Sequence, residues 1–265
     1  MITDSFDNVS QPVISPGDVG YTSGRFFDIC ICTFSENIVS ELISNRSYRQ
    51  VAELRCVNGS MPIYSIDLEG KSVGVAKIHV GSASAGADLI DINYTTGAVK
   101  FIVFGSTGCL DSSAVSGRYI IPTAAYRDEG LSYHYAPPSD YIAMPRSDRT
   151  AEIFASLGKP YVQGRVWTTD AFYRETRANM EKRVSEGCIA VDMEMAGLQA
   201  VCSFHGFELY AFLEAGDVSF GLDQKALSGN SSFSMDASER SKYDNCPISD
   251  KSLCPISAQL SLLST

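Results

Sequence analysis

The stretch GCIAVDMEMAGLQAVC, residues 187–202, predicts a buried strand that passes directly into an apolar helix, which indicates an α/β fold. The short apolar run GCIAV is typical of a strand in the interior of a sheet. From Met193 to Phe204, apolar residues recur at helical spacing. Asp192 and Glu194 lie at the junction, and a buried carboxylate without a partner is costly. We therefore expect a polar group to meet these two acids.

Two interpretations explain the acids. Asp192 is suited to capping the helix, because free amides and the helix dipole stabilise acids at a helix N-terminus. Glu194 lies beside Met193, an arrangement that fits a carboxylate offered to a ribose diol over an apolar floor. The residues alone give the capping and the ligand interpretation of Glu194 equal weight.

Apolar runs of strand length alternate with helix-like stretches along most of the chain. This alternation predicts one α/β domain, in which helices cover both faces of a mixed sheet in three layers. The predicted strands are 27–33, 62–67, 73–79, 100–105, 117–122, 189–192 and 208–213. The predicted helices are 36–43, 83–94, 150–157, 174–185 and 193–204.

The composition restricts the class of protein and its partners. With 265 residues, 45% hydrophobic and 20% charged, the chain resembles a soluble globular protein. Its net charge of -10 argues against binding to nucleic acid or to an anionic membrane, since both need clustered Lys and Arg. No apolar run is long enough to span a bilayer, and the N-terminus is polar and acidic, so we expect a cytoplasmic protein.

The eight cysteines lie mostly in apolar runs, which favours reduced core thiols over disulfides. Cys30 and Cys32 share one strand face, but no second Cys or His pair has the spacing of a zinc site, so no metal is expected. His79, His134 and His205 are scattered. The sequence suggests no Cys–His or Ser–His–Asp arrangement.

Residues 164–177, GRVWTTDAFYRETR, end a strand-like segment in two threonines and an acid, followed by two aromatics. Phe172 and Tyr173 are explained most simply as core residues. The more specific hypothesis is a planar base stacked on Phe172, because aromatic stacking accepts any nucleobase.

Two glycine-rich stretches follow predicted strands. In FGSTGCLD, residues 104–111, Ser106 and Thr107 lie between glycines, and we expect a turn there. Exposed amides with hydroxyls beside them form an anion nest, although a plain structural turn is the more frequent case. The second stretch, VGSASAG, contains Gly81. Small molecules bind at such carboxyl ends of strands in α/β sheets.

The end of the chain differs from the rest. Asp217 follows the last predicted strand in the sequence AGD, where a carboxylic acid could donate to a leaving group or only cap a loop. The residues from Lys225 onward contain eleven serines in forty-one positions and two aromatics. We therefore predict a domain over residues 1–224 and a poorly ordered tail over 225–265.

Taken in order, these stretches resemble the nucleoside phosphorylase and uridine phosphorylase superfamily, which includes the methylthioadenosine/adenosylhomocysteine nucleosidases. AVDMEMAGLQAVC resembles its V-E-M-E-x-A signature, TTDAFY resembles its S-D-x-F-Y, and GSTGCLDSSAVSGRYIIP resembles its G-[ST]-x-G segment with the strand that follows. The resemblance runs from about Asp28 to Asp217. Three motifs in the right order make it specific.

The resemblance implies a single three-layer α/β/α domain with a twisted, partly closed mixed sheet. It also implies a homodimer or a trimer of dimers, with sites shared across each dimer. The expected partners are a nucleoside and inorganic phosphate as co-substrate, without a cofactor. The implied roles are ribose binding for Met193 and Glu194, base binding for Thr107, Gly108 and Phe172, phosphate binding for Gly81 and Ser106, and general acid for Asp217.

The chain also departs from the family pattern. Residues 32–42, CTFSENIVSEL, replace the P-G-D-P-x-R turn of members that use phosphate, and Val103 replaces an expected arginine. The glutamine that reads a pyrimidine falls near Thr176, leaving Glu175 or Arg177 as substitutes. The first hypothesis is a phosphorylase that converts a uridine or purine nucleoside into free base and ribose 1-phosphate. The alternatives are a nucleosidase that uses water and a catalytically silent nucleoside-binding protein.

Overall fold

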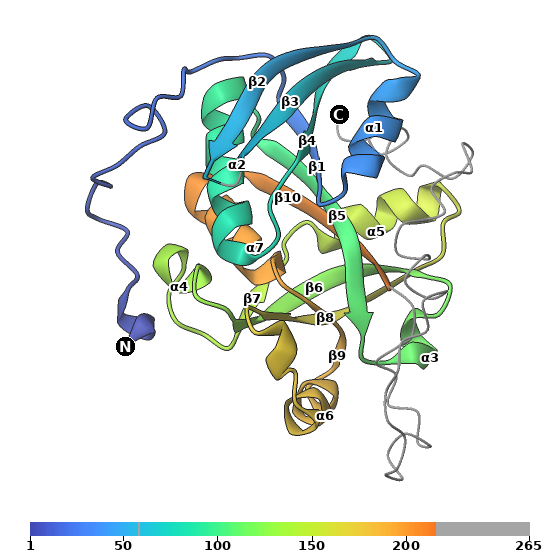
Figure 1. Ribbon diagram of the computed structural model, residues 1–265. Coiled ribbons are helices and arrows are strands. Elements are labelled where there is room, and N and C mark those ends of the chain that lie inside the picture. Colours follow the sequence, from blue (N-terminus) through green and yellow to red (C-terminus); the bar gives the residue numbers. More distant parts are fainter. Residues whose placement is uncertain (58, 216–265) are drawn as a thin grey trace.

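The computed structural model describes residues 1–57 and 59–215 (Figure 1). Within these residues, ten strands form one mixed sheet with helices on both faces, as the sequence predicts. The tail predicted over 225–265, the domain boundary at 224 and Asp217 lie outside the described residues. The N-terminal segment runs along the outside of the molecule before the first strand begins (Figure 1).

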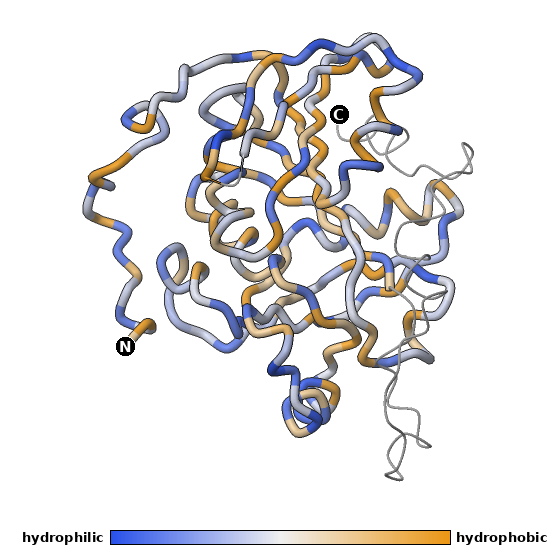
Figure 2. Tube along the Cα trace, viewed as in Figure 1, coloured by the Kyte–Doolittle hydropathy of each residue, from blue (hydrophilic) through white to orange (hydrophobic). Residues whose placement is uncertain are grey.

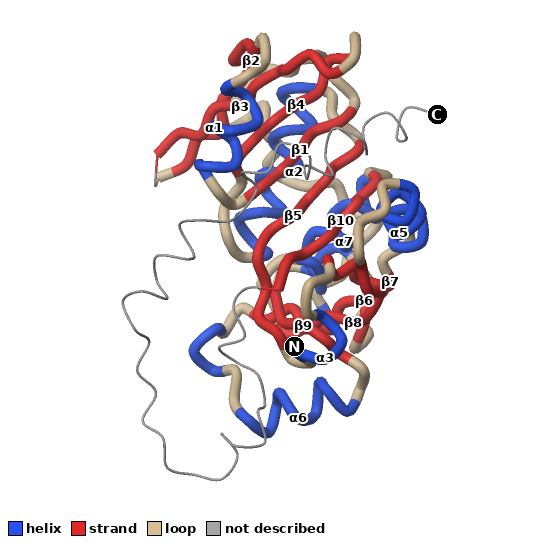
Figure 3. The backbone as a smooth tube through the Cα atoms, turned by 90° about the vertical axis from the view of Figure 1, so that its right-hand side faces the viewer, coloured by secondary structure: helices blue, strands red, loops and turns tan. Residues whose placement is uncertain are grey.

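The sheet follows the order β10-β6-β8-β9-β5-β1-β4-β3-β2, and β7 pairs with β6. Because β10 also pairs with β5, the strands β10, β6, β8, β9 and β5 close into a ring, and β1, β4, β3 and β2 extend from it as a twisted arm (Figure 3). The strands are β1 (Ile29–Thr33), β2 (Tyr48–Cys56), β3 (Gly59–Leu68), β4 (Lys71–Lys77), β5 (Lys100–Cys109), β6 (Tyr119–Asp128), β7 (Tyr141–Ala143), β8 (Tyr161–Thr169), β9 (Cys188–Asp192) and β10 (Glu208–Ala215).

Alternate residues of the central strands point to different helical layers. In β1, Cys30 and Cys32 face the cluster formed with α2 and α7, whereas Ile29 and Ile31 face the cluster formed with α1 and α5. This period of two is the reason that a strand buried on both faces is apolar throughout. The helices are α1 (Glu36–Ser44), α2 (Ser82–Thr96), α3 (Ser112–Val115), α4 (Ser132–Tyr135), α5 (Ser147–Ser156), α6 (Arg177–Ser185) and α7 (Met195–His205), with two 3-10 turns, η1 (Ile2–Asp4) and η2 (Phe172–Arg174).

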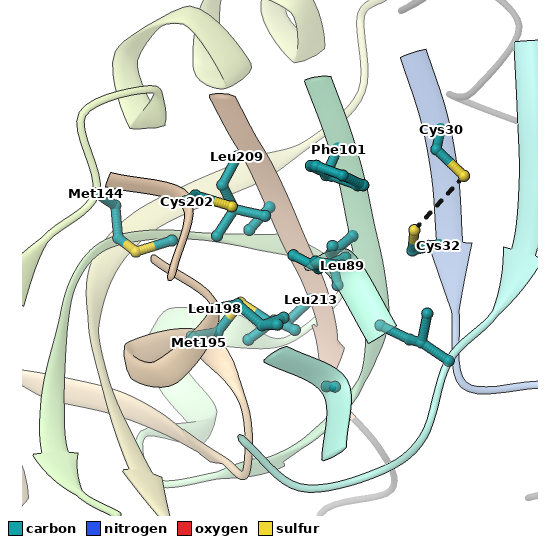
Figure 4. Packing of buried hydrophobic residues seen from close by; sticks show 14 of the residues in the cluster. Cys30, Cys32, Leu89, Phe101, Met144, Met195, Leu198, Cys202, Leu209 and Leu213 are labelled. Atoms are coloured by element: carbon teal, nitrogen blue, oxygen red, sulfur yellow. Dashed lines mark hydrogen bonds between the residues drawn. The ribbon is translucent and has the colours of Figure 1, made fainter. Parts of the chain in front are cut away.

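The layer of α2 and α7 packs on the sheet through large apolar side chains. Leu89 of α2 and Leu198 of α7 lie against Phe101 of β5 and Leu213 of β10 (Figure 4). Each of these four side chains is at most 1% exposed, and burying a side chain of this size contributes about 1.5–3 kcal/mol. The two helices are therefore fixed on the sheet, and so are the loops that precede them.

Cys30 and Cys32 are free thiols, and their sulfur atoms lie 3.8 Å apart in the same cluster (Figure 4). Burial raises the pKa of the Cys32 thiol well above its ordinary value. Both side chains are fully buried. The pair therefore acts as core packing.

The turn predicted at 104–111 is wrong, because β5 continues through it to Cys109. Gly108 pairs with Val191 of β9, and a Cβ added at Gly108 would lie 2.7 Å from Cγ1 of Val191. Glycine is required there for the close approach of two strands. Ser106 pairs with Glu214 in the parallel ladder between β5 and β10. The backbone of this segment therefore forms part of the sheet instead of an anion nest.

Hydrophobic residues follow the central strands, whereas α6 at the lower end is largely hydrophilic (Figure 2). Only Met180 and Arg183 of α6 are buried. None of the helices in the described ranges is long and apolar enough to cross a membrane.

Candidate functional site

Asp192 caps the helix that follows it. Its Oδ1 accepts hydrogen bonds from the amides of Glu194 at 2.9 Å and Met195 at 2.8 Å, and from the hydroxyl of Thr168 at 2.9 Å. The Thr168 hydroxyl also accepts from the amide of Ala196 at 3.0 Å, which fastens the end of β8 to the start of α7. The capping interpretation of Asp192 is confirmed. Its second oxygen, Oδ2, is buried without a hydrogen-bond partner among the described residues.

Glu194 meets a polar group from a distant part of the chain. Its Oε1 accepts a hydrogen bond of 2.7 Å from the amide of Gly81, which lies directly before α2. Gly81 has φ 91° and ψ 137°, a conformation that side-chain-bearing residues rarely adopt. The amide of Gly81, expected to contribute to phosphate binding, is therefore engaged by the carboxylate of Glu194 in this structure.

Met193 strengthens the same junction. Its carbonyl accepts hydrogen bonds from both the amide and the hydroxyl of Ser82, each at 2.9 Å. The loops that precede α2 and α7 are thus joined at adjacent positions. Three of the predicted site residues, Gly81, Met193 and Glu194, are brought together by this contact.

Both acids of the junction hold their protons more tightly than usual. Burial raises the pKa of Asp192 to about 6, against the hydrogen bonds that it accepts. Burial, together with the negative charge of Asp192, raises the pKa of Glu194 to about 7. Glu194 is only 7% exposed. Such a carboxylate is poised between its protonated and charged forms near neutral pH, where it can donate or accept hydrogen bonds.

Thr107 and Gly108 lie on β5 next to this junction. The hydroxyl of Thr107 donates to the carbonyl of Val191, the residue that precedes Asp192. Gly108 is in close contact with the same Val191. Both residues therefore hold β9 against β5, and this contact positions the acids at the end of β9.

Ser106 and Phe172, two further predicted site residues in the described part of the chain, lie at the surface. Ser106 is exposed on β5, and Phe172 is 47% exposed in η2, which follows β8. The ring of Phe172 contacts that of Tyr173 at a centroid distance of 5.1 Å and an interplanar angle of 76°. The core interpretation of Phe172 and Tyr173 is thus wrong, since Tyr173 is 94% exposed.

Two residues near the expected pyrimidine-reading position differ in environment. Glu175 is partly buried, and this burial raises its pKa to about 7. Thr176 caps α6, because its hydroxyl accepts the amide hydrogen of Asn179 at 3.4 Å. Of these two residues, Glu175 therefore has the side chain that is not engaged in capping.

One cluster of side chains in the structure belongs to none of the sequence motifs. Sγ of Cys56 lies 3.2 Å from Nε2 of His79, and Nδ1 of His79 lies 2.9 Å from Oδ2 of Asp88. The sequence suggests no such Cys–His arrangement, so this contact is a finding of the structure. The two ring nitrogens point to opposite partners, so the three groups do not converge on one point. Within the described ranges, no group of three or more His, Cys, Asp or Glu side chains could hold a metal ion.

Comparisons with known proteins agree on a family. A family model described as the phosphorylase superfamily matches residues 28–241. A DeoD-type purine nucleoside phosphorylase from Colwellia psychrerythraea is 30% identical over 163 residues, which are 58% of this chain and 67% of that protein.

Two further relatives have a lower percentage of identical residues. A DeoD-type purine nucleoside phosphorylase from an Exiguobacterium species is 24% identical over 155 residues, covering 56% of this chain and 64% of that protein. A uridine phosphorylase from Salmonella typhimurium is 26% identical over 156 residues, covering 53% of this chain and 61% of that protein. The chain thus spans somewhat less than two thirds of the length of these two relatives.

Proposed function

The chain belongs to the phosphorylase superfamily, and from this premise we propose that it is a nucleoside phosphorylase. It cleaves the N-glycosidic bond of a ribonucleoside with inorganic phosphate and releases the free base and ribose 1-phosphate. Relatives named as purine nucleoside, guanosine and uridine phosphorylases support this reaction class. Because these names refer to different bases, both purine nucleosides and uridine have to be assayed as substrates.

The single observation that carries the proposal is the buried carboxylate of Glu194. Its Oε1 accepts from the amide of Gly81, and its pKa is raised to about 7. A carboxylate held in this way can accept hydrogen bonds from the 2′- and 3′-hydroxyls of a ribose. Met193 lies beside it and offers an apolar surface to the sugar. Asp192 is sufficient to cap α7, which supports a ligand role for Glu194 in addition to its contact with Gly81.

The remaining groups fit the steps of glycosidic cleavage. The ribosyl group becomes positively charged in the transition state, so the enzyme must hold the sugar, stabilise the departing base and position the nucleophile. The exposed ring of Phe172 is suited to stacking on the base. The exposed Ser106 is suited to donating to phosphate. Asp217, outside the described residues, is proposed as the general acid by the resemblance alone.

Hydrolysis by water is the second candidate, and one observation favours it. Val103 replaces the arginine that the resemblance leads us to expect, and its side chain is fully buried in the cluster with α2. A phosphate dianion is normally held by a bidentate arginine.

For the phosphorylase reaction, we propose that a homodimer compensates for the missing arginine by lending a cation from the neighbouring subunit.

A product analysis tests the proposal. The protein is incubated with inosine, guanosine, adenosine and uridine, with and without inorganic phosphate, and sugar and base products are separated. Ribose 1-phosphate formed only with phosphate is the expected result. Free ribose formed equally in both conditions would replace the phosphorylase by a nucleosidase. No product with any nucleoside, together with nucleoside binding by calorimetry, would identify a silent binding protein.

A further inference from the structure

Cys56, His79 and Asp88 form a chain of contacts that shares no residue with the proposed nucleoside site. Sγ of Cys56 lies 3.2 Å from Nε2 of His79. On the other side of the ring, Nδ1 of His79 lies 2.9 Å and 3.1 Å from the two oxygens of Asp88. The backbone amide of His79 also donates to Asp88, at 2.7 Å. The carboxylate therefore holds both the ring and the backbone of the histidine.

The arm of the sheet brings the three residues together from separate elements. Cys56 is the last residue of β2, His79 follows β4, and Asp88 lies on α2. β3 connects β2 to β4 by antiparallel pairing on both sides. The end of β2 is itself held, because the hydroxyl of Tyr21 accepts from the amide of Arg55 at 2.7 Å.

The three side chains become more buried from Cys56 through His79 to Asp88. This order suits an exposed nucleophile, a base beside it and a buried group that orients the base. Cys56 is exposed, the side chain of His79 is 24% exposed, and that of Asp88 is 8% exposed. A carboxylate beside Nδ1 keeps the imidazole proton on that nitrogen, so Nε2 is free to accept a proton from the thiol. The sulfur itself remains open to solvent and can be reached by a small molecule.

We propose that Cys56, His79 and Asp88 form a nucleophilic thiol site that exchanges with a low-molecular-weight disulfide. Nε2 of His79 takes the proton of the Cys56 thiol, and the thiolate attacks one sulfur of the disulfide in line with its S–S bond. That bond breaks as a new disulfide forms to Cys56. The departing thiolate takes the proton from His79. Asp88 is a positioning residue, because its recorded contacts are with the ring and the backbone amide of His79 and not with the thiol.

Exchange with a disulfide suits this site better than acyl transfer. It needs a thiolate, an open approach to sulfur and a proton for the leaving thiolate, and the three residues supply all of these. Acyl transfer would additionally need donors for an oxyanion. In the described part of the chain, the other recorded contact of the Cys56 sulfur is the carbonyl of Gly59 at 3.4 Å, which is an acceptor.

The first experiment measures the reactivity of Cys56 in the full chain, without any nucleoside. The second-order rate of iodoacetamide labelling is followed by peptide mass spectrometry, so that the other cysteines are scored separately. At neutral pH we expect Cys56 to react about 10-fold faster than N-acetylcysteine. His79→Gln should remove this advantage, whereas His134→Gln, a change at an exposed histidine, should leave it unchanged. A rate equal to that of N-acetylcysteine, or one unaffected by His79→Gln, would overturn the proposal.

The second experiment uses oxidised glutathione as the disulfide. We expect one glutathionyl group on the peptide that contains Cys56, removed again by dithiothreitol, and slower addition in His79→Gln and Asp88→Asn. Circular dichroism melting shows whether each variant is folded. If Asp88→Asn does not fold, the parent measured against N-acetylcysteine still decides the matter. Adducts only on other cysteines would contradict the proposal, and none of these results depends on nucleoside cleavage.

Discussion

The amide of Gly81 and the carboxylate of Glu194, 113 positions apart in the chain, form a hydrogen bond of 2.7 Å. It joins the start of α2 to the start of α7, two helices that pack on the same face of the sheet. The orientation of Glu194, the residue proposed to bind the ribose, therefore depends on the backbone of Gly81 in another loop. Substitutions at these two residues and at their neighbours test this relationship.

Glu194→Ala is expected to lower kcat/KM for ribonucleosides by about 100-fold or more, because the acceptor for the ribose hydroxyls is lost. It also leaves the amide of Gly81 unpaired, which costs about 1–3 kcal/mol of stability. Glu181→Ala, at an exposed position of α6, is the control and should change neither quantity. Steady-state kinetics and urea melts measure both. A Glu194→Ala variant with the kinetics of the parent would return Glu194 to a structural role.

As the pH rises from 4.5 to about 7, the parent should lose stability through the ionisation of Glu194, and Glu194→Gln should lack this loss. In this window the folded protein keeps a proton on Glu194, because its pKa is raised to about 7, whereas the unfolded chain has lost it at the ordinary value of 4.5. The contribution of Glu194 to the free energy of unfolding is therefore fully present below pH 4.5 and is lost as the pH rises through about 7. The loss is at most about 3 kcal/mol.

Thermal melts of the two proteins across this pH range provide the measurement. Asp192 is present in both, so the difference between the two curves reports the titration of Glu194 together with its coupling to Asp192. Parallel curves for parent and Glu194→Gln would show that Glu194 titrates normally in the folded state.

Gly81→Ala should destabilise the protein by about 1–3 kcal/mol, because φ is 91° and alanine is strained there. It should also raise KM, since the amide that holds Glu194 moves. Gly117→Ala is the matched control: its φ is 66°, and an added Cβ meets no atom within 4 Å at either glycine. The control should lose stability but keep its kinetics. Equal kinetic effects in both variants would make the effect of Gly81 one of general stability.

Phe172→Ala is expected to raise KM for nucleosides about 10-fold, because stacking of one base contributes about 1–3 kcal/mol. Tyr173→Ala removes the neighbouring, more exposed ring and tests whether the contact between the two rings matters. The comparison is made with initial rates over a range of nucleoside concentrations. If the Tyr173 variant shows the larger effect, the base stacks on Tyr173 instead.

Ser106→Ala should raise KM for phosphate about 10-fold while KM for the nucleoside changes little, since a hydrogen bond to a charged group contributes about 1.5–3 kcal/mol. Ser116→Ala, at an exposed serine after α3, is the control. Initial rates with phosphate as the varied substrate give the answer. An unchanged KM for phosphate would remove Ser106 from the site.

The layers of the fold are predictable from the sequence where strands are buried on both faces. β1, β5, β9 and β10 are apolar runs, and each of these strands is present. β2 was not predicted, because it is an edge strand in which only Leu54 is fully buried, so its sequence shows no clear alternation. The three residues of β7 are too few for any pattern.

The site was predictable in part, because some of its residues differ in type from the residues around them. Asp192 and Glu194 stand out because acids are unusual in an apolar segment. Glycine is ambiguous from sequence alone, since Gly81 marks a turn whereas Gly108 marks a close approach of two strands. The contact between Cys56 and His79 joins residues from two elements that meet only through the pairing of β3. No spacing along the chain could reveal it.

The closure of β10 onto β5 leaves few open edges in the described part of the sheet, and β2 forms one of them. An unpaired edge is a template for aggregation through added strands. β2 carries three common protections: a register shift between Gln50 and Ala52, the cations of Arg49 and Arg55, and the hydroxyl of Tyr21 on the backbone of Arg55. Removal of Tyr21 would thus uncover the amide and the carbonyl of Arg55 on this edge, where a second chain could add a strand.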